Sequence, residues 1–167
     1  MEQSREKNLA RDDRAWNTVG WYTLAAEAKG AIPIPAMSAA IVVNNGVMIT
    51  HISDIYDENV TWDSVIQSLG FAGAVNVWGR MVFTEFAKAI SWGTGSPWGA
   101  VALSCIGIAT AGLQTLIIGA IAIKIARNGG KPLTAKEVAS VTSMAKKDYK
   151  SFVAGMRGKN PPDPSLA

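Results

Sequence analysis

The chain has very few of the residues that enzyme active sites and metal sites require. Its 167 residues include one cysteine, Cys105, and one histidine, His51. An internal disulfide is therefore excluded, and a catalytic triad lacks a nucleophile placed near the histidine. His51, Asp54 and Glu58 share a helix face, but a metal site there lacks a second imidazole or a thiolate. We therefore expect no catalytic residue, no cofactor and no metal, and we predict that the protein is not an enzyme.

Two further sequence signals are missing. The chain has no Gly-Lys-Ser/Thr phosphate-binding loop, so it is not itself a P-loop GTPase. The highly charged residues 1–13 are followed by no hydrophobic core and cleavage site of the secretory type, so secretion is not indicated. We expect the basic end of the chain to stay in the cytoplasm.

Charge is absent from residues 89–123, a run of 35 residues. A Gly-rich turn divides the run into the end of one apolar helix and the whole of another, 100–123. Crossing a bilayer takes about 20 apolar residues, and indole rings gather at the level of the lipid headgroups. The run either enters lipid or packs against other helices, and we favour a membrane hairpin. The residues assigned to this hairpin are Trp92, Trp98, Gly107, Ile108, Gly112, Leu116 and Gly119.

The fold class predicted from these patterns is all-α. Apolar residues recur at helical spacing, and no segment gives a competing strand signal. We expect a helical bundle with a Gly-rich apolar helical hairpin, associated with a membrane. The predicted helices are 4–29, 36–56, 62–90, 100–123 and a fifth that follows a capping box at 134–137. The corresponding segments are a charged N-terminal amphipathic helix (1–30), an apolar helical core with the hairpin (31–127), a basic amphipathic helix (128–157) and a disordered tail (158–167).

Polar side chains interrupt two of the apolar helices. Asn44 falls on the apolar stripe of the second helix, and Asn76, Arg80 and Glu85 fall within the third. Buried polar groups are normally hydrogen-bonded, and an arginine at the centre of a membrane helix costs about 2.5 to 3.5 kcal/mol. We therefore expect these four residues to be buried and satisfied inside the protein, Asn44 through an interhelical hydrogen bond. In a pore-forming protein, the three in the third helix would instead line a pathway.

Positive charge is concentrated towards the C-terminus. Residues 124–167 carry nine basic and three acidic side chains. Cations that follow an apolar segment keep that flank in the cytoplasm and attract anionic lipid headgroups. We predict that Lys146, Lys147 and Lys150, which lie opposite the apolar stripe of the last helix, contact anionic lipid. We expect no nucleic-acid binding, because the chain contains no nucleic-acid-binding motif.

Several short motifs follow one another in a recognisable order. They are Ala-Ile-Pro-Ile-Pro at 31–35 before a Met-rich helix, His-Ile-Ser-Asp-Ile-Tyr at 51–56, Ser-Leu-Gly at 68–70 and the Gly-rich hairpin. Over roughly residues 26–125 the chain resembles the domain of unknown function found beside Era-like GTPases and in YcjF-like membrane proteins. The resemblance implies an all-α, membrane-associated module, attached to or encoded with a GTPase, that has no established catalytic residues. The charged first helix and the basic last helix are not part of that pattern.

The function we predict is that of a non-enzymatic membrane-associated module that anchors, scaffolds or regulates a partner protein. By resemblance, a GTPase is the first candidate for that partner. The expected location is the cytoplasmic (inner) membrane, with both termini in the cytoplasm. Two alternatives remain open: a pore-forming or channel-like protein with an insertable hairpin, and a soluble oligomeric helical subunit. The expected partners are membrane lipids, a protein and, in the last case, further copies of the chain.

Overall fold

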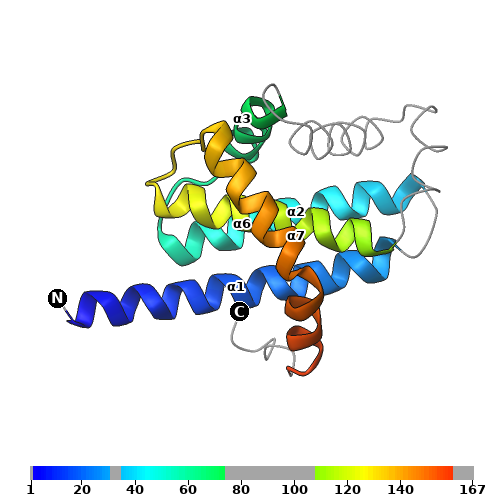
Figure 1. The fold of residues 1–167 in the computed structure, drawn as a ribbon, viewed down its shortest axis with the longest axis horizontal. Helices are drawn as coiled ribbons and strands as arrows, with labels where there is room; N and C mark the ends of the chain where they lie inside the picture. Colours follow the sequence, from blue (N-terminus) through cyan, green and yellow to red (C-terminus); the bar gives the residue numbers. More distant parts are fainter. Residues whose placement is uncertain (1, 31–34, 74–107, 160–167) are drawn as a thin grey trace.

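A computed structural model of the chain describes residues 2–30, 35–73 and 108–159, which form five α-helices and no strand. The all-α fold class is thereby confirmed over these residues. Figure 1 shows the arrangement. The helices are α1 (Glu2–Gly30), α2 (Pro35–Tyr56), α3 (Trp62–Gly73), α6 (Ile108–Arg127) and α7 (Ala135–Arg157).

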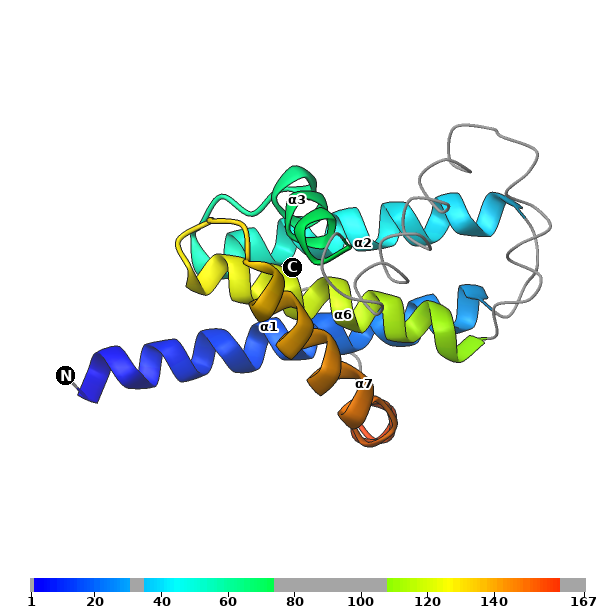
Figure 2. The same ribbon diagram turned by 45° about the horizontal axis from the view of Figure 1, so that its top comes forward.

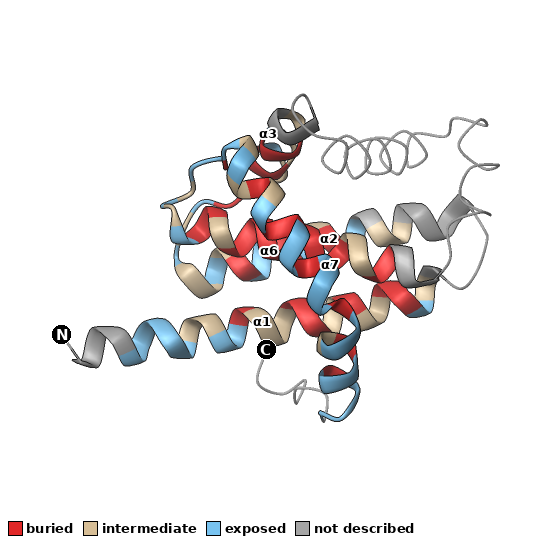
Figure 3. Cartoon of the chain, viewed as in Figure 1, coloured by how far each residue is buried: buried red, intermediate tan, exposed pale blue. Residues whose placement is uncertain are grey.

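Helices α1, α2 and α6 pack against one another, and α7 crosses α6 and α1 obliquely (Figures 1 and 2). Helix α3 packs against α6 and α7. The N-terminal half of α1 projects beyond the other helices, and its described side chains are mostly exposed (Figure 3). The charged half of α1 is therefore exposed to solvent, whereas its apolar half packs against the other helices.

A hydrophobic core joins all five helices. Because residues of the predicted segments 1–30, 31–127 and 128–157 all contribute to it, these segments form one structural unit. The largest fully buried side chains come from every helix and from the loop before α7: Val19, Met48, Ile52, Val65, Leu69, Ile118, Ile121, Ile123, Ile125, Leu133 and Val138.

The start of α3 and the start of α7 are both capped by threonine. The Thr61 hydroxyl accepts a hydrogen bond from the Ser64 amide over 3.2 Å. At α7 the capping box predicted from the sequence is present: the Thr134 hydroxyl accepts from the Glu137 amide, and the Glu137 carboxylate accepts from the Thr134 amide over 2.9 Å. These bonds satisfy amides that the first turn of a helix leaves unpaired.

Helices α2 and α6 end in the same way. Gly129 follows α6 with φ 67°. The amides of Gly129 and Gly130 each donate over 3.0 Å to a carbonyl in the last turn of α6. This is a Schellman motif, in which a residue in the left-handed conformation closes the helix. Asp57 takes the corresponding place after α2 with φ 56°, a conformation that aspartate adopts more readily than most residues.

Two of the predicted helices have ends that differ from the described helices. The predicted helix 100–123 ends four residues too early, because α6 continues to Arg127. The prediction ended the helix at the first charge, yet Lys124 and Arg127 suit the last turn, because cations favour the negative end of the helix dipole. The third predicted helix, 62–90, is described only as far as Gly73, and the predicted hairpin turn lies outside the described residues.

The described part of the apolar run packs against protein. No side chain from Ala111 to Ala126 is exposed, and α6 contacts α1, α2, α3 and α7. Of the two routes expected for the run, this part therefore takes the second. Within the described ranges, no helix combines the length and the apolarity that crossing a membrane requires.

Candidate interaction surface

Helix α7 has a buried face and an exposed basic face. Lys146, Lys147 and Lys150 are all exposed, as the predicted contact with anionic lipid requires. Lys136, in the first turn of the helix, is exposed as well. We call these four lysines the basic face of α7. The buried residues of the helix are Val138, Val141, Thr142, Ala145, Tyr149, Val153 and Met156.

Glu27 of α1 fixes the C-terminal half of α7. Its side chain lies in the apolar half of α1 and is only 10% exposed. One carboxylate oxygen accepts a hydrogen bond from the Tyr149 hydroxyl over 2.7 Å, and the other accepts from Arg157 Nη2 over 2.9 Å. These two bonds compensate for the burial of the charge. Burial and the neighbouring Glu27 carboxylate raise the pKa of Tyr149, so its hydroxyl remains a donor.

Gly112 of α6 provides the space for this contact. A Cβ at this position would lie 2.2 Å from the Tyr149 hydroxyl oxygen and 2.6 Å from Cγ of Glu27. Both distances are shorter than normal contacts, so any side chain at position 112 would displace Tyr149 or Glu27 where the three helices meet. Gly119 has a similar place further along α6, where a Cβ would lie 2.6 Å from Cγ2 of Val19.

A second polar network joins α1, α2 and α6. Arg127 Nε donates to Oδ1 of Asp12 over 3.0 Å, and the Tyr56 hydroxyl donates to the same oxygen. Partial burial raises the pKa of Asp12, but the bonds from Arg127 and Tyr56 and the charge of Arg127 outweigh it, so this pKa lies below its usual value. Burial and the Asp12 carboxylate raise the pKa of Tyr56 to about 12. This network joins α1, at Asp12, to the C-terminal ends of α2 and α6.

Asn44 is buried and makes interhelical hydrogen bonds, as expected. It accepts from Nζ of Lys29 over 3.0 Å and donates to the Tyr22 carbonyl over 3.2 Å. The neighbouring Asn45 was not singled out in the sequence, but it is also buried, and it accepts from the Thr115 hydroxyl over 2.9 Å. Two successive asparagines therefore connect α2 with two different helices.

The predicted hairpin residues are only partly described. Leu116 is buried in the core at 2% exposure, so it contacts protein, as Gly112 and Gly119 do. Ile108 is the first residue of α6, and its side chain is outside the described set. The remaining predicted positions lie outside the described residues: Trp92, Trp98 and Gly107 of the hairpin, and the polar residues Asn76, Arg80 and Glu85.

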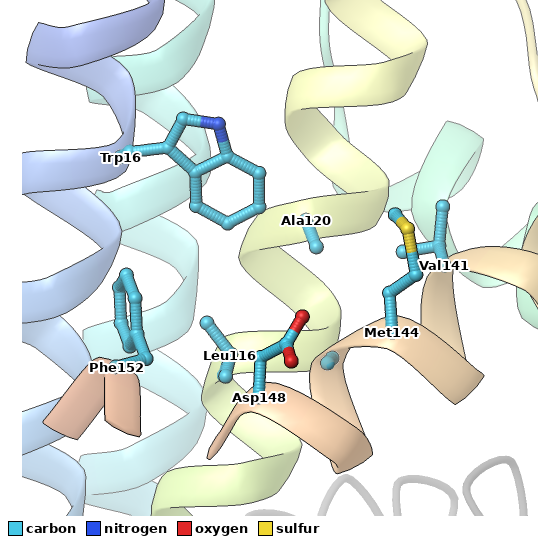
Figure 4. Close-up of a pocket in the computed structure, with 8 residues that line it drawn as sticks. Trp16, Leu116, Ala120, Val141, Met144, Asp148 and Phe152 are labelled. Atoms are coloured by element: carbon cyan, nitrogen blue, oxygen red, sulfur yellow. The ribbon is translucent and has the colours of Figure 1, made fainter. Parts of the chain in front are cut away.

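A groove of about 310 Å³ lies between α1, α6 and α7 (Figure 4). Trp16 and Phe152 meet edge to face at its α1 side, with ring centroids 6.1 Å apart. Asp148, which is exposed to solvent, is the one charged residue among those that line it. We call this feature the α1/α7 groove. Its lining residues are Trp16, Leu116, Ala120, Val141, Met144, Ala145, Asp148 and Phe152.

Sequence patterns did not predict the two polar networks or the groove. Glu27 did carry a signal, because it follows Val19 and Thr23 at intervals of four residues and so belongs to the buried stripe of α1. A charge on such a stripe needs a partner from another helix. Asp148 carried no comparable signal, because its position matters only once Trp16 is known to face α7.

His51 of α2 contacts Tyr22 of α1. The Tyr22 hydroxyl lies 3.1 Å from Nδ1 of His51, where the two rings also meet edge to face. Over the described ranges, no group of three or more His, Cys, Asp or Glu side chains is placed to hold a metal ion. Comparisons with known proteins found no match: no family model fits the chain, and no curated protein or solved structure is significantly similar to it.

Proposed function

We propose that this protein is a non-enzymatic helical module that attaches to an anionic membrane surface and anchors, scaffolds or regulates a partner protein. The observation that supports this most is the basic face of α7, which is exposed along a helix whose opposite side is buried. A lysine near an anionic membrane contributes about 1 kcal/mol. Several such lysines act together only when one element presents them in the same direction.

The way α7 is held favours such a role. The capping box fixes its first turn, and the bonds from Tyr149 and Arg157 to Glu27 fix its last two turns. The lysines between these points therefore keep a common orientation. Ordering the helix then adds little to the entropic cost of binding a surface.

The location follows from the same basic face, which suits the cytoplasmic side of the inner membrane, with both termini in the cytoplasm. A GTPase is the first candidate for the partner, by the resemblance of residues 26–125. The projecting half of α1, with its exposed charged residues, offers a surface for that partner. Insertion of the apolar run 89–107 stays a prediction, because it lies outside the described residues.

A soluble oligomeric subunit is the second candidate. One observation favours it: α6, the most apolar described helix, is covered by protein and not left for lipid. The two candidates differ in whether the folded chain binds vesicles.

Sedimentation with vesicles tests the proposal. The full chain should sediment with vesicles that contain anionic lipid at low salt, but not with neutral vesicles, and high salt should release it. Lys147→Gln combined with Lys150→Gln should weaken binding by about 30-fold, since two lysines contribute about 2 kcal/mol. Lys7→Gln with Lys131→Gln removes the same charge from exposed positions outside α7 and should have a much smaller effect. Equal effects of the two pairs, or no binding at all, would contradict the proposal.

A further inference from the structure

The α1/α7 groove is apolar over nearly its whole wall. Six of its eight lining side chains carry neither nitrogen nor oxygen, and Figure 4 shows how the lining side chains surround the hollow. The exceptions are Trp16 and Asp148. Asp148 is exposed to solvent, and the exposed Lys147 and Lys150 lie beside it on α7. The wall therefore presents apolar surface to water, which favours a ligand that covers it.

A second cavity, of about 530 Å³, adjoins the groove and carries positive charge. Trp16 and Phe152 line both hollows. The second cavity adds Arg14 and Lys159 and a single acid, Asp13, so its two cations and one acid give a net charge of +1. Neither cation forms an ion pair or a side-chain hydrogen bond with any described residue. An apolar wall therefore lies next to two cations that have no partner among these residues.

We infer that the groove and the adjoining cavity together bind a long-chain fatty acid. Its acyl chain lies against Leu116, Ala120 and Val141 and brings no polar group that would need a partner there. Its carboxylate pairs with Arg14 and Lys159, and hydrogen bonds between charged groups of this kind are stronger than neutral ones. The inference does not depend on the proposed membrane attachment, because the ligand is a fatty acid free in solution.

Polarity and size decide between this occupant and others. A peptide segment would place N–H and C=O groups against walls that offer them almost no partner, which is unfavourable. A cationic amphiphile would bring its charge next to Arg14 and Lys159. A groove of about 310 Å³ lies at the lower end of the range of small-ligand sites, about 300 to 1,000 Å³, and suits one acyl chain better than two. Met144, at 57% exposure, has a flexible side chain that can adjust to such a chain.

Amphiphiles with one chain length and different heads test the inference on the full chain labelled with ¹⁵N, each below the concentration at which it forms micelles. Decanoate should shift the indole N–H signal of Trp16 and the amide signals of Ala120 and Ala145. It should bind at least about tenfold more tightly than decyltrimethylammonium, because only the anion pairs with the cations. Equal binding of the two, or shifts confined to residues outside the groove and the cavity, would overturn the inference.

Two further ligands test the role of the acyl chain. Octanoate should bind about 15-fold more weakly than decanoate, since each buried CH₂ contributes about fourfold to affinity. A blocked Leu-Leu-Glu peptide presents apolar and acidic groups on a peptide backbone, and it should bind more weakly than decanoate. Equal affinity of octanoate and decanoate would contradict burial of the chain. Tighter binding of the peptide would assign the groove to an acidic protein segment and overturn the inference.

Variants of the two cations locate the carboxylate. Arg14→Gln with Lys159→Gln should weaken decanoate binding at least about tenfold and leave binding of the uncharged decanol unchanged. Lys7→Gln with Lys131→Gln removes the same charge from exposed positions outside the cavity and should have little effect. Unchanged affinity of the folded Arg14 and Lys159 variant for decanoate would also overturn the inference.

A variant of the wall locates the acyl chain. Met144→Glu places a charge on the wall and should weaken the binding of both decanoate and decanol. Leu9→Glu makes the same change at an apolar residue that is also 57% exposed but lies outside the groove, and it should leave binding unchanged. Circular dichroism and thermal unfolding verify that each variant folds. Equal effects of the two substitutions would contradict binding in the groove.

The vesicle assay separates this inference from the proposed function. Lys147→Gln with Lys150→Gln should weaken vesicle binding and retain the preference for decanoate over decyltrimethylammonium. Loss of vesicle binding with that preference retained would remove the membrane role alone. Vesicle binding without that preference would remove the groove's role alone.

Discussion

The hydrogen bond between Tyr149 and Glu27 makes a quantitative prediction about stability. Tyr149→Phe removes one oxygen atom and leaves the ring in the core, where Tyr149 is 8% exposed. The Glu27 oxygen that accepted this bond is then left buried without a hydrogen-bond donor. Arg157 still binds the other carboxylate oxygen. The substitution therefore isolates one hydrogen bond to a buried charge.

The expected loss follows from the two bonds that Glu27 makes. A hydrogen bond to a charged group contributes about 1.5 to 3 kcal/mol. The pair with Arg157 compensates little, because the Arg157 side chain is 66% exposed and exposed ion pairs contribute about 0 to 1 kcal/mol. Tyr149→Phe should therefore lower the free energy of unfolding by about 1.5 to 3 kcal/mol.

Urea unfolding of the full chain measures this loss. Tyr22→Phe is a matched control, because its hydroxyl makes an exposed hydrogen bond to His51, and it should cost less than about 1 kcal/mol. Glu27→Gln completes a double-mutant cycle with Tyr149→Phe, and we expect a coupling energy above about 0.5 kcal/mol. A cost for Tyr149→Phe no larger than that of the control, or no coupling, would refute the reasoning.

Two further predictions concern packing and pH. Gly112→Ala should destabilise the fold by about 1 to 3 kcal/mol in thermal unfolding, whereas Gly70→Ala, where a Cβ would meet nothing within 4 Å, should stabilise it by up to about 1 kcal/mol. Because the pKa of Asp12 is lowered in the folded state, its contribution is complete above about pH 4 and is lost as the pH falls through that lowered pKa. The stability difference between the native chain and Asp12→Asn should therefore shrink in acid, and a difference independent of pH would contradict this assignment.

The helices could be predicted because their signals are local. Helical spacing of apolar residues, the capping box at Thr134 and the glycines after α6 each act within a few residues of sequence. Even the polar Asn44 could be placed, because its position on an apolar stripe requires a partner on another helix. Local chemistry therefore determines where α1 and α2 begin and end, to within two residues, and where α7 begins.

The environment of α6 could not be predicted in the same way. Lipid and a protein core are both apolar, so an uncharged sequence is equally compatible with either. Leu116 was placed in a membrane hairpin, yet it is buried among other helices. The groove could not be predicted for a related reason, since Trp16 and Asp148 are far apart in sequence and line the same groove only because α7 crosses α1. Such contacts depend on tertiary packing, which no single-helix pattern records.

The basic face of α7 is expected to meet the anionic surface directly, and a fluorescent label that responds to its environment tests this. The label is attached to Ser143→Cys, beside Lys146 and Lys147, or to Thr50→Cys on α2. Both positions are exposed. Each variant also carries Cys105→Ser, so that the label has a single site. Anionic vesicles should shift the emission of the label at position 143 to shorter wavelengths, high salt should reverse the shift, and the label at position 50 should not respond. No shift at position 143, or equal shifts at both positions, would contradict attachment through α7.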